Sequence, residues 1–326
     1  MPLPSHIVGH RLVLEELSTD LETGNVVHAY LFTGPRHLGK FTVVKWFAKE
    51  LLRSSARDAE DDRRICDQAD RLLHPDLFVL DQLWIEGICE DFEVISRSSN
   101  VPQQHRKEAK AKTDEISIED IRVLHERLYE VGTGQYRCCL IHRAERMTEA
   151  AANALLKMLE EPPAGMVFLL TSESPSVLLP TVVSRARVLR LSRVGRQELL
   201  PLLEGVLEDD AHFILRLAQG APGIVCTLRD DPEALRVQRL TYAKALSFWE
   251  SNSLMERLQL LTPLHARTQE AQEFLLHLAL ALRERKPENF QLPATALLSL
   301  TSGLRTNAQR RLLTQQFALA VSDSHP

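Results

Sequence analysis

A glycine- and lysine-containing loop between an apolar run and a helical pattern places the strongest constraint on the fold of this chain. Residues 34–40 read GPRHLGK, which fits the pattern G-x-x-x-x-G-K. The apolar run HAYLFT precedes the loop, and residues 41–53 carry apolar side chains at helical spacing. A strand, such a loop and a helix in this order form a cradle whose backbone N–H groups and lysine bind phosphate. The N-terminal part is therefore expected to be an α/β domain.

Strand-like and helical patterns alternate on both sides of this loop. A leading helix is expected over residues 9–24, because Gly24 is a typical helix stop. The runs at 136–141 and 166–171 read as strands, and the segment between them reads as a helix ended by two prolines at 162–163. This alternation predicts a parallel sheet flanked by helices. The side chains expected in its core are Trp46, Phe47, Cys138, Cys139, Leu155, Leu156 and Leu159.

The character of the chain changes after residue 191. From about 195 to 321 every periodic segment is helical, and short turns separate the segments. No repeat of fixed period is present. Because 326 residues exceed the usual size of one domain, more than one domain is expected, with an all-helical second half.

Composition excludes several functional classes. Lys plus Arg number 39 and Asp plus Glu number 44, so the net charge is 39 − 44 = −5, and the chain as a whole does not attract nucleic acid or an anionic membrane. The five cysteines form no C-x-x-C pair, which favours a reducing compartment. The sequence has neither a leader-like apolar segment at its start nor a window apolar enough to span a bilayer, so the cytoplasm is the expected location.

The phosphate loop lacks the hydroxyl that normally follows its lysine. Phe41 stands where a Ser or Thr would ligate Mg²⁺, and Thr42 is one position late, on a different face of the helix. His37 adds bulk where many such loops have a second glycine. We expect a vestigial loop, retained as a turn, rather than productive nucleotide binding, although weak ATP or ADP binding stays open.

The second motif that a nucleotide hydrolase needs is altered as well. An apolar strand should end in carboxylates that hold the metal, but the strand at 138–141 is followed by His142 and Arg143. The nearest carboxylate, Glu145, is interpreted as a residue at the start of a helix or on the surface. The sequence therefore predicts no Mg²⁺ site.

Three segments carry a resemblance to a known family. HAYLFTGPRHLGK, IHRAERMTEAAANALLKMLEEPP and LLTSESPSVLLPTVVSRARVLRL, in this order and spacing, resemble the AAA+ clamp-loader subunits of bacterial DNA polymerase III. The resemblance covers about residues 5–230, and its pattern is closer to the delta-prime branch than to the gamma/tau motor. It implies a RecA-like AAA+ domain at 1–192, a small helical lid at 193–231 and a helical collar domain for oligomerisation at 232–326.

The resemblance also assigns roles to positions. It places the phosphate loop at Gly34, Gly39 and Lys40, a polar sensor at Thr171 or Ser172, and the family's Ser-Arg-Cys signature at Ser184-Arg185-Ala186, without the cysteine. A second sensor arginine of the motor subunits has no counterpart in the stretch GAPGI at 220–224.

Arg185 is the residue that the resemblance makes functional. An arginine presented in trans to a neighbour's γ-phosphate accelerates hydrolysis by about 10³- to 10⁵-fold. Together with Ser184 of the signature, Arg185 is therefore expected to serve a neighbouring subunit. The alternative for Arg185 is a structural salt bridge, which Arg187 and Arg190 could share.

Family members often carry a four-cysteine zinc module after the phosphate-loop helix. The equivalent stretch keeps only Cys66, with His74 eight residues later, and structural zinc needs four ligands. We therefore expect neither zinc nor Mg²⁺, and no other cofactor. Residues 86–113 are interpreted as a solvated insertion, and its basic run 106–112 as a solvated loop rather than a DNA contact.

The resemblance implies a non-hydrolysing clamp-loader subunit. Its partners would be the gamma/tau and delta subunits, the sliding clamp and, through the assembled complex, primed DNA, and none would be a membrane. No intrinsic ATPase activity is expected, although the chain would belong to a polymerase holoenzyme. Two alternatives stay open: an ATPase active in its own right, with Thr42 or a water chain recovering Mg²⁺, and a scaffold that uses the AAA+ shape only for contact.

Overall fold

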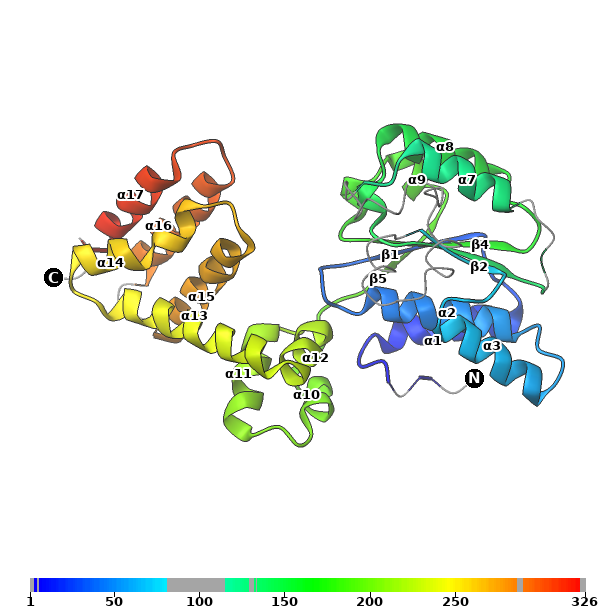
Figure 1. The fold of residues 1–326 in the computed structure, drawn as a ribbon, viewed down its shortest axis with the longest axis horizontal. Coiled ribbons are helices and arrows are strands. Elements are labelled where there is room, and N and C mark those ends of the chain that lie inside the picture. The colour runs from blue at the N-terminus through cyan, green and yellow to red at the C-terminus, as the bar shows by residue number, and fades with distance from the viewer. Residues whose placement is uncertain are drawn as a thin grey trace, which may run out of the picture. The chain divides into compact units, whose positions relative to one another are not determined.

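The runs predicted as strands form one parallel sheet in the computed structural model (Figure 1). The order across the sheet is β2-β3-β4-β1-β5, so the strand before the phosphate loop lies near the centre. Because every paired neighbour is parallel, all strands end at the same edge. The strands are β1 (Ala29–Thr33), β2 (Leu77–Leu80), β3 (Arg137–Ile141), β4 (Met166–Ser172) and β5 (Arg187–Arg190).

Helices cover both faces of this sheet (Figure 1). One face packs against α1 (Arg11–Thr23), α2 (Lys40–Arg53) and α3 (Ala59–Asp70). The other face packs against α7 (Ile118–Leu128), α8 (Glu149–Glu160) and α9 (Pro180–Val183). Each central strand is buried along its whole length, which explains why the strands read as continuous apolar runs. The predicted α/β fold class, a sheet flanked by helices, is confirmed.

The helix boundaries follow the stop and start signals of the sequence. Gly24 adopts a left-handed conformation (φ 69°) after α1, and its N–H donates to carbonyls of the last turn. The side chain of Thr148 caps α8 by accepting the N–H of Ala151 at 3.2 Å. Helix α8 ends at Glu160, two residues before the first proline.

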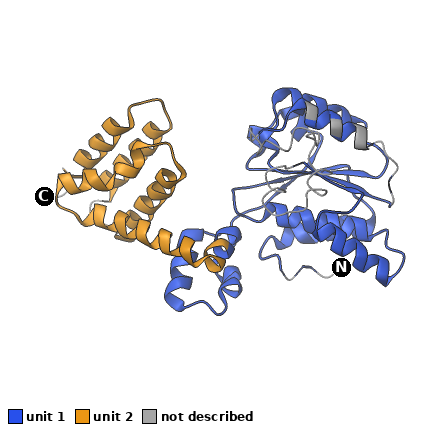
Figure 2. Ribbon diagram, in the orientation of Figure 1, with its two compact units in different colours: residues 1–226 blue, residues 227–326 orange. Residues whose placement is uncertain are grey.

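The chain divides into two compact units, residues 1–226 and 227–326 (Figure 2). After β5, short helices follow: α10 (Arg196–Leu199), a 3₁₀ turn (Leu200–Leu203), α11 (Glu208–Ala218) and α12 (Pro222–Asp230). Further 3₁₀ turns lie at Ala144–Arg146 and Pro175–Val177. The structure describes residues 3–4, 6–80, 115–128, 132, 134–285 and 290–322. The expected insertion at 86–113, with its basic run, lies outside these ranges.

Unit 2 is built from helices, as predicted for the second half. Phe248 and Trp249 pack against Phe317, with the rings of Phe248 and Phe317 stacked at 5.3 Å between centroids. The indole N–H of Trp249 donates to the carbonyl of Leu278 at 2.9 Å, so its polar atom is satisfied inside the core. The helices are α13 (Pro232–Glu250), α14 (Leu254–Leu260), a 3₁₀ turn (Thr262–His265), α15 (Gln269–Arg285), α16 (Gln291–Leu304) and α17 (Arg310–Ser322).

In the ranges that the structure describes, none of the helices combines the length and the apolar character that crossing a membrane requires. Cys138 and Cys139 are fully buried in β3, and burial raises the pKa of both thiols. They are small core residues, as predicted.

His74 makes the stability of unit 1 sensitive to acid. Its ring is buried, and Nδ1 accepts the N–H of Asp76 at 3.1 Å, which requires an unprotonated Nδ1. Burial lowers the pKa of His74 below its ordinary value, so the unfolded chain binds the proton more tightly than the folded chain. This contribution to stability is present above pH of about 6.5 and is lost as the pH falls through the lowered pKa.

We therefore expect the free energy of unfolding of unit 1, measured by urea denaturation, to fall between pH of about 7.5 and about 5. In the His74→Asn variant an amide oxygen can accept the same N–H without titrating, so its profile should be flatter. Parallel profiles for the two proteins would contradict this role of His74.

Candidate functional site

The glycine loop joins the end of β1 to the start of α2, as the sequence predicts. Gly34 has φ 146°, and a Cβ there would lie 2.4 Å from the carbonyl oxygen of Leu191. Gly39 forms the N-cap of α2 with φ 80°. Both glycines are thus required by backbone conformation, and at Gly34 also by close approach of the chain.

The ammonium group of Lys40 is turned back onto the loop. Its Nζ donates to the carbonyl oxygens of Gly34 at 2.6 Å and Pro35 at 2.7 Å. Burial lowers the pKa of Lys40, and the negative charge of Glu145 opposes that effect. A phosphate bound to this lysine would compete with two carbonyl contacts that the loop itself supplies.

His37 gives the loop a shape that a second glycine would not require. It has φ 61°, which is uncommon for a residue with a side chain. Its carbonyl accepts the N–H of Gly223, in α12, at 2.8 Å, and a Cβ at Gly223 would lie 2.9 Å from that oxygen. Burial lowers the pKa of His37. The loop is therefore packed directly against the start of α12 within unit 1.

Aromatic and basic side chains stand where Mg²⁺ ligands would be needed. The ring of Phe41 packs edge-on against the ring of His142 at 5.0 Å between centroids. Thr171, at the end of β4, accepts the N–H of Arg143 at 2.8 Å and lies 3.2 Å from Nδ1 of His142. The fold thus brings together the position after the lysine, the end of β3 and the polar residue of the next strand. An aromatic ring, an imidazole and a guanidinium do not offer the oxygen ligands that Mg²⁺ prefers.

Glu145 is a site residue that sequence reasoning missed. It lies in the 3₁₀ turn after β3, as expected of a residue at the start of a helix, but its two carboxylate oxygens are buried, so its interpretation as a surface residue was wrong. Neither oxygen has a hydrogen-bond partner, and Nε of Arg143 is 3.9 Å from Oε1. The cause is the left-handed conformation of Arg143 (φ 54°), which turns the chain back after the strand. No sequence signal announces that conformation at an arginine.

These groups surround a cavity of about 390 Å³. Its charged lining is mixed, because Glu145 and Glu173 accompany the cations, and Glu173 pairs with Arg36. Arg185 is not part of the lining. The lining residues are Arg36, His37, Leu38, Gly39, Lys40, Phe41, His142, Arg143, Glu145, Glu173 and Gly223.

Ser184 and Arg185 lie on the surface between α9 and β5. Nη2 of Arg185 is 2.6 Å from Oε1 of Glu160, and Nη1 donates to the carbonyl of Thr181 at 3.0 Å. About a third of the arginine side chain (34%) is exposed. The structure therefore contains the salt bridge that was the structural alternative for Arg185, and it also leaves this cation accessible from outside the chain.

The next arginine is structural. Nη1 of Arg187 is 2.8 Å from Oδ2 of Asp20, and Nη2 is 2.5 Å from Oε1 of Glu16. The hydroxyl of Tyr30 donates to the same Asp20 oxygen at 2.8 Å, and burial raises the pKa of Tyr30. This network ties β5 to α1 and β1, so Arg187 is committed to holding the strand that follows Arg185.

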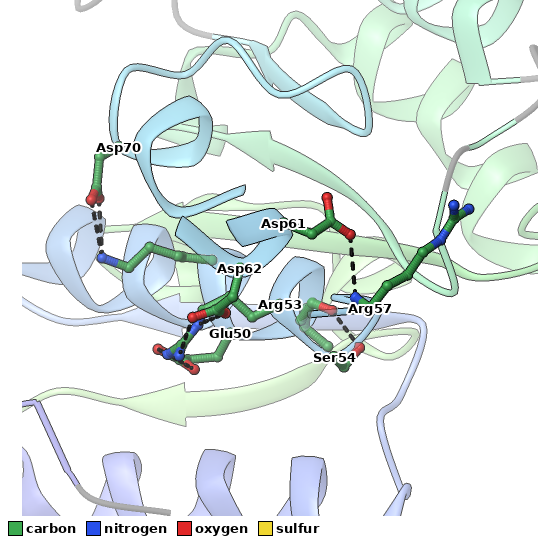
Figure 3. A network of polar contacts seen from close by, with 9 residues as sticks. Glu50, Arg53, Ser54, Arg57, Asp61, Asp62 and Asp70 are labelled. Carbon is green, nitrogen blue, oxygen red and sulfur yellow. Dashed lines mark hydrogen bonds and ion pairs between the residues drawn. The ribbon is translucent and has the colours of Figure 1, made fainter. Parts of the chain in front are cut away.

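An ion-pair network occupies the stretch compared with a zinc module (Figure 3). Arg53, at the end of α2, binds Glu50 at 2.9 Å and Asp62 of α3 at 2.7 Å. The hydrogen bonds from Arg53 lower the pKa of Asp62. Lys49 is 3.1 Å from Oδ1 of Asp70 at the other end of α3. These contacts hold α3 on α2, and the described part of the chain contains no group of three or more His, Cys, Asp or Glu placed to hold a metal ion.

Comparisons with known proteins agree on one family. A family model described as DNA polymerase III, delta subunit, matches residues 9–195. DNA polymerase III subunit gamma/tau of Mycobacterium tuberculosis is 28% identical over 252 residues, which is 74% of this chain and 39% of that protein. DNA polymerase III subunit delta' of Pseudomonas aeruginosa is 31% identical over 202 residues, which is 60% of this chain and 53% of that protein.

The matched region thus covers about two fifths of the gamma/tau relative and about half of the delta' relative. Among solved structures, a DNA polymerase III gamma subunit-related protein from Thermotoga maritima aligns with 95% of this chain and 98% of its own, at 17% identity and a TM-score of 0.46.

Proposed function

The chain belongs to the DNA polymerase III delta-subunit family of AAA+ clamp-loader proteins, and from this premise we propose that it is the delta-prime type of subunit, which hydrolyses no ATP and lends Arg185 to a neighbour. The observation that carries the proposal is the packing of Phe41 against His142 beside Lys40. It puts two rings where the family's catalytic members need oxygen ligands for magnesium.

The chemistry of the cavity supports this interpretation. Transfer of a γ-phosphoryl group depends on Mg²⁺ to neutralise the developing charge between phosphates. Here the end of β3 contributes His142 and Arg143, and a cation at the second position repels the metal. The ammonium of Lys40 already has two carbonyl partners. The loop then functions as a structural connection between β1 and α2, and no Mg²⁺, zinc or productive nucleotide is part of this proposal.

Arg185 supplies what the chain contributes instead. A guanidinium stabilises charge on the transferred phosphoryl group because its fork of N–H donors matches two oxygens at once. Arg185 is partly exposed and lies outside the lining of the chain's own cavity, so a pocket on an adjacent subunit is the site that it fits. Ser184 precedes it and receives a 3.5 Å contact from its Nη1.

The proposed assembly joins this chain to gamma/tau and delta subunits, which together open the sliding clamp and place it on primed DNA. Unit 2 supports assembly, because it exposes many large apolar side chains for a unit of its size, and such surfaces mark protein contacts. We propose residues 1–192 as the AAA+ core, 193–231 as the lid and 232–326 as the collar domain. The exposed apolar residues of unit 2 are Val237, Leu240, Leu254, Met255, Leu276, Phe290, Leu292, Leu298, Leu312 and Leu319.

One observation favours a second candidate, an ATPase active in its own right. The carboxylate of Glu145 lines the cavity with both oxygens lacking hydrogen bonds, and a carboxylate is a ligand that Mg²⁺ accepts. Under this alternative Glu145 would replace the carboxylates missing at the end of β3.

Turnover by the isolated chain separates the two candidates. We expect phosphate release from Mg²⁺-ATP at the rate of the uncatalysed control, because no complete set of metal ligands faces Lys40 in the part of the chain that the structure describes. The Glu145→Gln and Lys40→Ala variants should release phosphate at that same rate. Magnesium-dependent turnover by the wild-type chain that both substitutions abolish would establish the second candidate and overturn the first.

A further inference from the structure

The contacts of Arg185 within its own chain point to a positioning residue beside the proposed arginine finger. Both terminal nitrogens of the guanidinium are engaged: Nη2 with Glu160 at 2.6 Å and Nη1 with the carbonyl of Thr181 at 3.0 Å. On the basis of the proposed function, we propose that Glu160 is a latch, which holds Arg185 in a resting position and must release it before the guanidinium enters a neighbouring pocket.

The two acceptors are held by separate elements, so the resting position is well defined. Glu160 is the last residue of α8, just before the prolines that end the helix. Thr181 lies in α9, which starts at a proline and packs against α8. The arginine is thereby folded back along the surface of its own chain, and its two terminal N–H groups point at acceptors that do not leave with it.

A carboxylate competes directly with a phosphate for these donors. Both groups present two oxygens with the geometry that the guanidinium fork matches, so Nη2 binds either Glu160 or a γ-phosphate oxygen. The carbonyl of Thr181 carries no net charge and competes less. Glu160 is therefore the contact whose removal frees the arginine.

The latch must also be weak enough to open. The side chains of Arg185 and Glu160 are 34% and 49% exposed, and ion pairs this accessible to water contribute little. Releasing such a pair changes an equilibrium by about two- to fivefold. A γ-phosphate with its higher charge can overcome that preference, whereas the bare chain keeps the arginine in its resting position.

The test uses the reconstituted clamp-loader complex and its steady-state ATP turnover. Glu160→Gln removes the charge and keeps the size of the side chain. Glu161→Gln is the matched control, because Glu161 is the next residue, is exposed and has no ion pair in the described part of the chain. We expect kcat/KM for ATP to rise about two- to fivefold in Glu160→Gln and to stay at the wild-type value in Glu161→Gln.

Two further measurements separate a latch from a merely structural contact. The difference between wild type and Glu160→Gln should shrink as ionic strength rises, because salt screens an exposed ion pair. In an Arg185→Ala background, adding Glu160→Gln should leave the single-turnover rate unchanged, since nothing remains to be released.

Three results would overturn the latch: a kcat/KM for Glu160→Gln equal to that of Glu161→Gln, a lowered kcat/KM, or an effect of Glu160→Gln that persists without Arg185. Each of them leaves the proposed function standing if Arg185→Ala alone lowers turnover. If Arg185→Ala leaves turnover intact, the proposed function fails, and the latch fails with it.

Discussion

Replacing Arg185 with alanine is expected to slow ATP hydrolysis by about 10³- to 10⁵-fold in the pocket that receives its guanidinium. The arginine stabilises charge that develops on the transferred phosphoryl group, so its loss raises the barrier without abolishing nucleotide binding. Rapid-quench single-turnover measurements on the reconstituted complex, with the variant in this chain only, would measure the effect on the affected pocket.

Two variants make this prediction specific. Arg190→Ala removes an exposed arginine at the end of β5 and should leave turnover at the wild-type rate. Arg185→Lys keeps the charge but not the fork of N–H donors, so most of the loss should persist. If Arg185→Ala hydrolyses ATP as fast as the wild-type complex, the chain is a scaffold that uses its AAA+ shape only for contact.

Replacing Phe168 with alanine is expected to lower the free energy of unfolding of unit 1 by about 3 to 5 kcal/mol. Phe168 is fully buried in β4, and its partners across the sheet are Ala29 in β1 and Cys139 in β3. Because both of these neighbours are small, neither can fill the volume that the ring leaves.

Urea denaturation combined with hydrogen exchange resolved by peptide would follow this loss in unit 1. Phe168→Leu, which leaves a smaller cavity, should lose less stability than Phe168→Ala. Equal stability of the alanine variant and the wild type would contradict tight packing of the sheet core around β4.

The main elements of unit 1 could be predicted because their signals are local. Buried strands such as β3 and β4 read as continuous apolar runs, and the helix between them has a capping threonine before it and prolines after it. The order of the strands in the sheet could not be predicted in the same way, since it depends on contacts between segments far apart in the sequence.

Helix α3 shows where apolar periodicity fails as a signal. Only Ile65 and Ala69 of this helix are buried, so residues 54–74 read as a charged stretch without a defined structure. Its position depends on ion pairs with α2, such as that between Arg53 and Asp62. Charge pairs between elements have no fixed spacing in a sequence, and the network was therefore not foreseen.

The same limit applies to the site. The glycines, Lys40 and Phe41 could be placed from the sequence because they lie within one motif. The burial of Glu145 depends on the backbone conformation of Arg143, and the pairing of Arg185 with Glu160 depends on how α9 packs on α8. Such features appear only when the chain is folded.

One comparison tests the central claim most directly: single-turnover ATP hydrolysis by two reconstituted complexes that carry either Lys40→Ala or Arg185→Ala in this chain. A silent pocket beside Lys40 and a working arginine at the surface predict wild-type rates in every pocket for the first complex, and the loss of one pocket's hydrolysis for the second. The reverse pattern, with hydrolysis lost in Lys40→Ala and retained in Arg185→Ala, would show that this chain is itself a motor.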